Sequence, residues 1–194
     1  MLDTKARRFI QPVLGAVAAA CLRMGIGANA LTIAGMLLGV GAAALVAIGQ
    51  PVAGFLVLWL SGLVDAADGT LARLTKATPL GAILDITFDR VVEISMIAAL
   101  AWLHPAARFE MVILAGVIAV AMSLFLSIGA AVQNASSKSF HYAPGLGERT
   151  EAFICLSLMI LDRERLILWT WVFIAVIVFT MGQRLVHARR MLAE

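Results

Sequence analysis

The segment Leu63–Arg90, LVDAADGTLARLTKATPLGAILDITFDR, raises the question that decides how the chain is interpreted. The sequence on both sides of it is strongly apolar. The segment itself carries four aspartates, Asp65, Asp68, Asp85 and Asp89. Ionisable side chains are unfavourable inside a membrane, and where they occur they usually mark a functional site. The four carboxylates beside apolar helices are therefore candidates for a functional site.

The composition around this segment predicts an all-α integral membrane protein. Hydrophobic residues make up 62% of the 194 residues and charged residues 14%. Soluble domains contain about 45–50% apolar and about 25% charged residues. The length fits a single domain, residues 1–194. The net charge of +3 agrees with basic loops beside a membrane, and no basic stripe interleaved with aromatic residues indicates a nucleic-acid partner.

Hydropathy divides the chain into six predicted membrane-spanning helices. The stretch from Met24 to Val64 has no charged residue, and the turn Gly49–Pro51 separates two helices within it. A helix needs about 20 residues to cross the hydrocarbon core. The fifth span has only ten apolar residues, so it crosses only if Glu148, Arg149 and Glu151 lie at the membrane boundary. The predicted spans are Ala30–Gly49, Val52–Arg73, Gly81–Leu103, Met111–Val132, Ala152–Leu161 and Leu166–Gln183.

The distribution of basic residues predicts the orientation. Residues 1–25 are expected to form an amphipathic helix on the membrane surface, followed by a six-span core, residues 26–194. An even number of spans places both termini on one side. Of the 15 lysines and arginines, 12 fall on that side and 3 on the other, Arg108, Arg163 and Arg165. Because basic loops stay cytoplasmic, we expect both termini and the aspartates on the cytoplasmic side of a bacterial inner membrane.

The helical repeat places the aspartates on two facing rows. Residues three or four apart share one helix face. The first row is Asp65, Asp68, Gly69 and Ala72, and the second is Gly81, Asp85 and Asp89. Clusters of carboxylates suit hard divalent cations, so the rows predict one or two Mg²⁺ or Mn²⁺ ions that also hold phosphate oxygens. The alternative is that the aspartates are interfacial charges paired with Arg73, Lys76 and Arg90.

The same rows carry a resemblance to a known family. DAADGTLAR (residues 65–73) and GAILDITFD (residues 81–89) resemble the signature of the CDP-alcohol phosphotransferases, also called CDP-alcohol phosphatidyltransferases. The family pattern is D-x-x-D-G-x-x-A-R, a short linker, and G-x-x-x-D-x-x-x-D. Two features depart from it: the linker Leu74–Leu80 is one residue shorter than is common, and Ala28 replaces a frequent Pro before Asn29. We expect Asn29 to be the N-cap of the first span.

The resemblance implies a reaction and a role for each residue. It implies transfer of a phosphatidyl group from a CDP-diacylglycerol donor to a polar, phosphorylated alcohol, with release of CMP, in phospholipid biosynthesis. Asp65, Asp68 and Asp85 become ligands of two divalent cations, and Asp89 both a ligand and the catalytic general base. Arg149, with Arg90 and Lys138 near it, becomes the binding residue for the acceptor phosphate. The implied CDP-binding residues are Asp68, Gly69, Ala72, Arg73 and Gly81.

Other functions and assemblies stay open at this point. A second activity of the same family uses a CDP-choline or CDP-ethanolamine type of donor with a lipid acceptor. An ion-coupled transporter also carries carboxylates inside the membrane, although transport predicts them near the bilayer midplane and here they lie at one end of the spans. The resemblance further implies a homodimer, and the small residues of Thr32–Ala44 permit close helix packing.

Overall fold

A computed structural model describes residues 2–135 and 149–192, and in these ranges the chain is helical apart from short turns. Two 3₁₀ turns, η1 (Pro105–Ala107) and η2 (Arg163–Arg165), join consecutive long helices. The long helices are α1 (Leu2–Arg23), α2 (Ala28–Ala47), α3 (Pro51–Leu74), α4 (Pro79–Leu103), α5 (Arg108–Ala135), α6 (Arg149–Leu161) and α7 (Leu166–Leu192).

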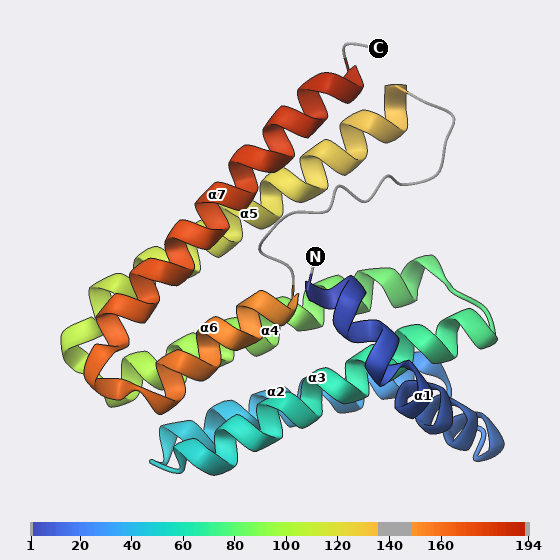
Figure 1. The fold of residues 1–194 in the computed structure, drawn as a ribbon, viewed down its shortest axis with the longest axis horizontal. Helices are drawn as coiled ribbons and strands as arrows, with labels where there is room; N and C mark the ends of the chain where they lie inside the picture. Colours follow the sequence, from blue (N-terminus) through green and yellow to red (C-terminus); the bar gives the residue numbers. More distant parts are fainter. Residues whose placement is uncertain (1, 136–148, 193–194) are drawn as a thin grey trace.

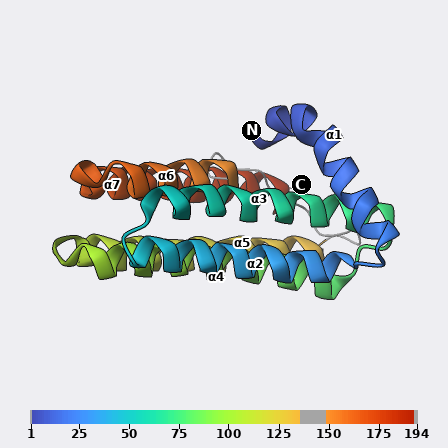
Figure 2. The same ribbon diagram turned by 90° about the horizontal axis from the view of Figure 1, so that it is seen from below.

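The helices are arranged in two layers (Figure 2). One layer contains α3, α6 and α7, and the other contains α2, α4 and α5. Helix α2 packs against both α3 and α4, while α5 and α7 run side by side as a separate long pair (Figure 1). Helix α6 connects the two parts because it contacts α3 as well as α7. Helix α1 crosses the end of this arrangement and packs on α3.

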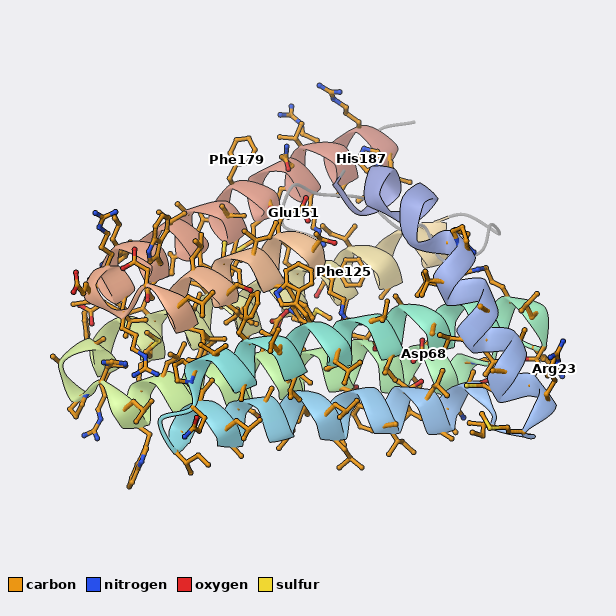
Figure 3. The ribbon with its side chains drawn as sticks, turned by 60° about the horizontal axis from the view of Figure 1, so that its bottom comes forward. Arg23, Asp68, Phe125, Glu151, Phe179 and His187 are labelled. Atoms are coloured by element: carbon orange, nitrogen blue, oxygen red, sulfur yellow. The ribbon has the colours of Figure 1, made fainter. Side chains whose placement is uncertain are left out.

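The membrane character predicted from composition is confirmed, and the chain is an integral membrane protein. Within the described residues, four stretches are long and apolar enough to cross a membrane: Ala28–Ala47, Pro51–Leu74, Pro105–Ala131 and Arg163–Leu192. Large apolar side chains point outward from them, as Phe179 does on α7 with an exposed fraction of 57% (Figure 3). Such side chains suit contact with lipid tails.

The predicted count of six spans is not established for the other two helices. Helix α4 has 25 residues, but its first half carries several charged side chains, and α6 has only 13 residues. Both therefore stay predictions as membrane spans. The N-terminal helix spans Leu2–Arg23, and its amphipathic character and its location on the membrane surface stay predictions as well.

The turn between α3 and α4 is fixed by local interactions. Helix α3 ends at Leu74, and the amide of Thr75 donates the last hydrogen bond to it. Thr78 then caps α4, because its side-chain oxygen accepts a 3.0 Å hydrogen bond from the amide of Gly81. Pro79 occupies the first position of α4, where its missing N–H has no cost. The short linker therefore changes only the loop and leaves both aspartate rows intact.

The prediction for Asn29 is wrong. Helix α2 begins at Ala28, and its N-cap is Gly27, which has no side chain to accept a hydrogen bond. Asn29 thus lies within the first turn of α2 rather than before it. Its side-chain oxygen is instead directed toward Gly81 at the start of α4, because a Cβ built on Gly81 would lie 3.1 Å from Asn29 Oδ1.

Small residues let α2 approach both of its neighbours closely. A Cβ built on Gly39 would lie 2.4 Å from a methyl carbon of Val92 on α4, and one on Gly54 of α3 would lie 2.9 Å from the carbonyl oxygen of Ala42. Ser61 of α3 donates a 2.8 Å hydrogen bond to the carbonyl of Gly35 on α2. Helix α2 thus contacts both α3, which carries the first aspartate row, and α4, which carries the second. These contacts fix the position of one row relative to the other.

We expect Gly39→Ala to destabilise the fold by about 1–3 kcal/mol, the usual effect of overpacking a tight contact. The new methyl group has no room beside Val92, whose two methyl carbons would lie 2.4 and 2.6 Å away. The apparent thermal unfolding midpoint of the purified protein in detergent measures the effect. Gly41→Ala on the same helix is the matched control, because a Cβ there meets nothing within 4 Å. Equal midpoints for the two variants would contradict the predicted contact.

Candidate active site

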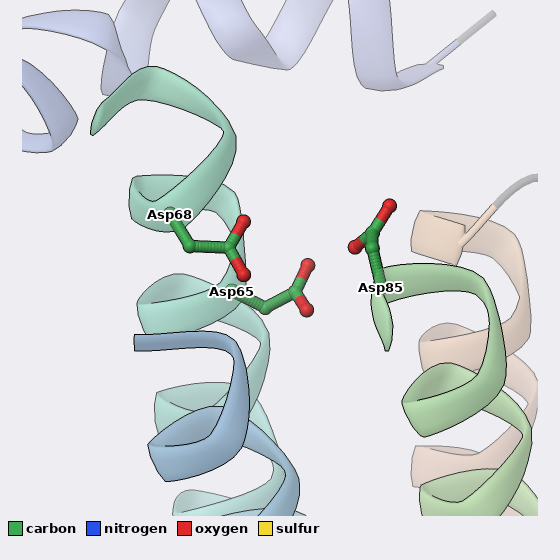
Figure 4. Close-up of side chains that lie close together, drawn as sticks. All are labelled: Asp65, Asp68 and Asp85. Atoms are coloured by element: carbon green, nitrogen blue, oxygen red, sulfur yellow. The ribbon is translucent and has the colours of Figure 1, made fainter. Parts of the chain in front are cut away.

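Three of the four aspartates come together between α3 and α4. Asp65 and Asp68 project from the end of α3, and Asp85 faces them from the start of α4 (Figure 4). One carboxylate oxygen from each of the three lies within 4.8 Å of the others. We call these three residues the aspartate cluster. The facing rows predicted from helical spacing are therefore present.

The aspartate cluster has the chemistry of a divalent-cation site. Asp68 is only 6% exposed and lies between α3 and the layer formed by α2 and α4 (Figure 3). Among the described residues, its Oδ2 atom is buried and has no hydrogen-bond partner. A buried carboxylate oxygen without a partner is unfavourable, and a hard cation that prefers oxygen ligands removes this penalty. Three carboxylates at this spacing therefore fit Mg²⁺ or Mn²⁺.

Asp89, the fourth aspartate, lies beside the cluster and is held by an arginine. Arg149 Nη1, at the start of α6, is 2.9 Å from Asp89 Oδ1, and the same nitrogen pairs with Asp65 Oδ2. The Arg149 guanidinium also lies over the ring of Phe153, with its carbon 5.4 Å from the ring centroid. All four predicted aspartates are thus close together, three as a group and the fourth linked to it through Arg149.

A first pocket, which we call the linker pocket, opens beside the cluster where the linker joins α3 to α4. Its volume is about 240 Å³. A Cβ built on Gly69 would approach only the Arg73 side chain, at 3.6 Å, so the backbone there is accessible to a ligand. Arg73 Nη2 donates a 2.9 Å hydrogen bond to Thr70 Oγ1. The lining residues are Ala28, Asn29, Thr32, Asp68, Gly69, Ala72, Arg73, Lys76, Ala77, Thr78, Gly81, Ala82 and Asp85.

The linker pocket contains every residue predicted to bind the CDP group: Asp68, Gly69, Ala72, Arg73 and Gly81. It also contains Thr32 and Asn29 of α2, which the sequence analysis did not assign to the site. No spacing rule connects α2 to the aspartate rows, so only the packing of α2 between α3 and α4 brings these two side chains in.

A second pocket, which we call the arginine cavity, lies between α4, α5, α6 and α7. Its volume is about 300 Å³, and three guanidinium groups line it, those of Arg90, Arg149 and Arg184. The Arg184 guanidinium carbon lies 4.7 Å from the centroid of the Phe125 ring. The other lining residues are Asp85, Ile86, Asp89, Glu93, Ile118, Ala121, Met122, Phe125, Ala152, Phe173, Ile177 and Thr180.

Arg184 is a site residue that the sequence analysis missed. It belongs to the basic end of α7, and there the excess of basic residues had been interpreted only as an orientation signal. Arg90 and Arg149 had both been singled out, and both line the cavity. Lys138, the other basic residue considered for this region, lies outside the described residues.

The aspartates connect the two pockets. Asp85 lines both of them, Asp68 lines the linker pocket, and Asp89 lines the arginine cavity. The pocket walls come from the beginnings of α2, α4 and α6, from the end of α3, and from the middle of α5 and α7. Neither pocket is lined by a residue of the turns η1 and η2, so the site lies away from these two turns.

Comparison with known proteins agrees with this arrangement. The family profile described as CDP-alcohol phosphatidyltransferase matches residues 26–186. Archaetidylinositol phosphate synthase of Methanothermobacter thermautotrophicus is 31% identical over 151 residues, which cover 77% of this chain and 70% of that protein. The inner membrane protein YnjF of Escherichia coli is 36% identical over 89 residues, 46% of this chain, and the match spans only 43% of YnjF.

Solved structures extend the similarity to the fold. A crystal structure of Mycobacterium tuberculosis phosphatidylinositol phosphate synthase with CDP-DAG bound superimposes with a TM-score of 0.73 at 26% identity. The superposition covers 91% of this chain and 94% of that one. A second structure of the same enzyme, in complex with manganese and citrate, has a TM-score of 0.71.

Proposed function

This chain belongs to the CDP-alcohol phosphatidyltransferase family, and from that premise we propose that it transfers the phosphatidyl group of CDP-diacylglycerol to a phosphorylated polar alcohol, releasing CMP. The observation that carries the proposal is the position of Asp85, which lines both the linker pocket and the arginine cavity. A donor in one pocket and an acceptor in the other then meet at the aspartate cluster. The solved relative with CDP-DAG bound supports the choice of donor.

In this reaction the acceptor hydroxyl oxygen attacks the phosphorus that carries the diacylglycerol. The new phosphorus–oxygen bond forms as the bond to the CMP oxygen breaks, and CMP leaves. Asp89 takes the hydroxyl proton, since it lines the cavity in which the acceptor binds. Asp65, Asp68, Asp85 and Asp89 would hold two divalent cations, which neutralise the negative charge on the diphosphate and the leaving group when bound. Such transfers depend mainly on positioning and charge neutralisation.

The remaining donor contacts come from the linker pocket. Gly69 lets the nucleotide approach the backbone of α3, and the small residues Ala72 and Gly81 line the same pocket. Arg73 offers a planar fork to a phosphate, as arginines do in bidentate contacts. Its bond to Thr70 fixes one end of this side chain before a ligand arrives. The diacyl tails of the donor then extend sideways into the bilayer.

The acceptor binds in the arginine cavity. Three guanidinium groups suit a phosphate ester, because arginine binds phosphate through short charge-assisted hydrogen bonds. The cavity volume of about 300 Å³ is that of a small polar molecule. Two of the named relatives are an archaetidylinositol phosphate synthase and a phosphatidylinositol phosphate synthase, so inositol phosphate is the first acceptor to test and glycerol phosphate the second.

Arg149→Ala is expected to raise the acceptor KM about 10- to 150-fold, which corresponds to the 1.5–3 kcal/mol of a hydrogen bond to a charged group. Arg149 pairs with Asp89 and so holds the acceptor phosphate next to the base. Donor KM should change little, and Arg149→Lys should recover only part of the loss because lysine lacks the fork. Steady-state CMP release at varied acceptor concentration measures these values.

Arg165→Ala is the matched control for this variant, because Arg165 is an exposed arginine in the turn η2 before α7, at the opposite end of the bundle from the site. It should leave both KM values unchanged. If the acceptor KM of Arg149→Ala equals that of the wild type, Arg149 is only a counter-ion of the aspartates.

We further propose that α4 and α6 complete a six-span core and that α1 lies on the membrane surface. The basic helix ends beside the site favour a cytoplasmic location for it in a bacterial inner membrane. A homodimer is our expectation for the assembly. Native mass spectrometry from mild detergent tests it, and a single-protomer mass would count against it.

A donor and acceptor panel tests the function as a whole. The purified protein is given CDP-diacylglycerol, CDP-choline or CDP-ethanolamine with inositol phosphate, glycerol phosphate, inositol, serine or glycerol, and CMP is measured. CMP release with CDP-diacylglycerol and a phosphorylated alcohol is expected. Release only with CDP-choline and a lipid acceptor would assign the other activity of the family. Uptake of a solute into liposomes without CMP release would instead indicate a transporter.

A further inference from the structure

Glu93 continues the second aspartate row by one helical turn and is not explained by the reaction. It lies four residues after Asp89 on α4 and is 2% exposed. Its Oε1 atom is 2.8 Å from Nη2 of Arg90, and both residues line the arginine cavity. A charged side chain this deeply buried in a membrane protein is a candidate for a functional role.

Stability alone does not account for this pair. The removal of two charges from water offsets most of their attraction, so apolar residues of similar size would serve the fold as well. Among the described residues, Glu93 Oε2 and Arg90 Nε are buried without hydrogen-bond partners. One is an acceptor and the other a donor on the same two side chains. A two-point, side-on pair of a carboxylate with an arginine uses these two atoms as well, and such a pair fixes the plane of the guanidinium.

The exposure of the two side chains indicates how they divide the work. Both side chains line the cavity, but that of Arg90 is 33% exposed and that of Glu93 only 3%, so Arg90 offers much more of its surface to a ligand. The other two cavity arginines are supported in a similar way. Arg149 lies over the buried ring of Phe153, and Arg184 over that of Phe125. Each guanidinium that lines the cavity thus rests on a buried side chain.

We propose that Glu93 is a positioning residue, which holds the Arg90 guanidinium at the cavity wall in the orientation that binds the phosphate of the acceptor. Glu93 itself does not touch the acceptor and acts only through Arg90. The identity of the ligand rests on the proposed function, but the coupling between the two side chains does not. Loss of Glu93 should therefore matter only while Arg90 is present.

A double-mutant cycle tests this dependence. Glu93→Gln, Arg90→Gln and the double variant are purified in detergent with Mg²⁺, and binding of inositol phosphate and of glycerol phosphate is measured by calorimetry. Each single variant should raise the Kd of the better ligand about tenfold, the lower end of what a hydrogen bond to a charged group contributes. The double variant should bind no more weakly than Arg90→Gln. The Kd for CDP, measured in the same samples, should stay within about twofold of the wild-type value. A difference of this size is what independent, distant sites usually show.

The controls separate positioning from folding. Glu110→Gln removes a carboxylate in the first turn of α5 that does not line the cavity, and it should not change either affinity. Thermal midpoints show whether each variant is folded, and Glu93→Asp, whose carboxylate is one methylene shorter, should bind with intermediate affinity. If Glu93→Gln does not fold, the charge-neutral double variant is compared with Arg90→Gln alone. Equal affinities support the inference, and a further loss overturns it.

The outcomes also distinguish this inference from the proposed function. Phosphate-ester binding that depends on the Glu93–Arg90 pair, without CMP release by the wild type, would remove the proposed reaction and keep the positioning role. CMP release by the wild type, with Glu93→Gln binding the acceptor as tightly as the wild type does, would keep the reaction and end the positioning role. Losses that multiply in the double variant would show that Glu93 acts independently of Arg90.

Discussion

Asp89→Asn is expected to lower kcat about 10²- to 10⁴-fold, the usual contribution of a positioned general base. An amide of nearly the same shape cannot take the acceptor proton. The fold should survive, because Arg149 keeps its second carboxylate partner, Asp65. The aspartate cluster is also intact in this variant, so at least one cation and the CDP donor should still bind. Single-turnover CMP release and binding of CDP to the same sample measure the two effects separately.

Glu164→Gln is the matched control for the loss of one negative charge, since Glu164 is exposed in η2 at the other end of the bundle. Its turnover should equal that of the wild type. Near-normal rates for Asp89→Asn would end the assignment of Asp89 as the base. A simultaneous loss of CDP binding would show instead that Asp89 is needed to assemble the donor site.

Removal of divalent cations should abolish activity, with a fall of at least about 10³-fold, because metal ions stabilise the charge of such transition states by several kcal/mol. Without a cation, the carboxylates of Asp65, Asp68 and Asp85 repel the diphosphate rather than hold it. EDTA treatment followed by addition of Mg²⁺ or Mn²⁺ tests this, and either ion should restore CMP release. The manganese complex of a solved relative supports the choice of ions.

Asp68→Asn provides the corresponding change in the protein. It replaces the buried carboxylate whose Oδ2 atom lacks a partner among the described residues. In Asp68→Asn the affinity for Mn²⁺, measured from the paramagnetic resonance signal of the ion, should fall together with activity. Glu164→Gln should change neither quantity. Full turnover after exhaustive chelation, with no metal detected in the sample, would exclude a cation from the reaction.

Local spacing was enough to predict much of this site. The rows of Asp65, Asp68 and Asp85 follow from the helical repeat alone, because each row lies within a single helix and needs no knowledge of tertiary packing. The break between α3 and α4 was predicted to within two residues, because spans predicted to end at Arg73 and to begin at Gly81 have helix limits at Leu74 and Pro79. The signature residues of the linker pocket belong to the same two helices. These predictions agree with the structure for that reason.

Residues that enter the site from distant helices were harder to find. Asn29 and Thr32 reach the linker pocket only because glycines let α2 pack between α3 and α4. Arg184 reaches the arginine cavity from the far end of the chain. Its sequence context is a basic helix end, and such an end has the same composition whether it faces water or a ligand. Contacts between sequence-distant helices depend on crossing geometry, which no local pattern specifies.

The position of Asp85 in the walls of both pockets has a stereochemical consequence for the proposed reaction. If the nucleotide occupies the linker pocket and the alcohol occupies the arginine cavity, the alcohol oxygen attacks the phosphorus from one side of the aspartate cluster. The CMP oxygen then leaves toward the other side. Such a direct displacement has no covalent phosphatidyl-enzyme and proceeds in line. A donor made chiral at that phosphorus would then give a product of inverted configuration, whereas two successive displacements would return the original handedness.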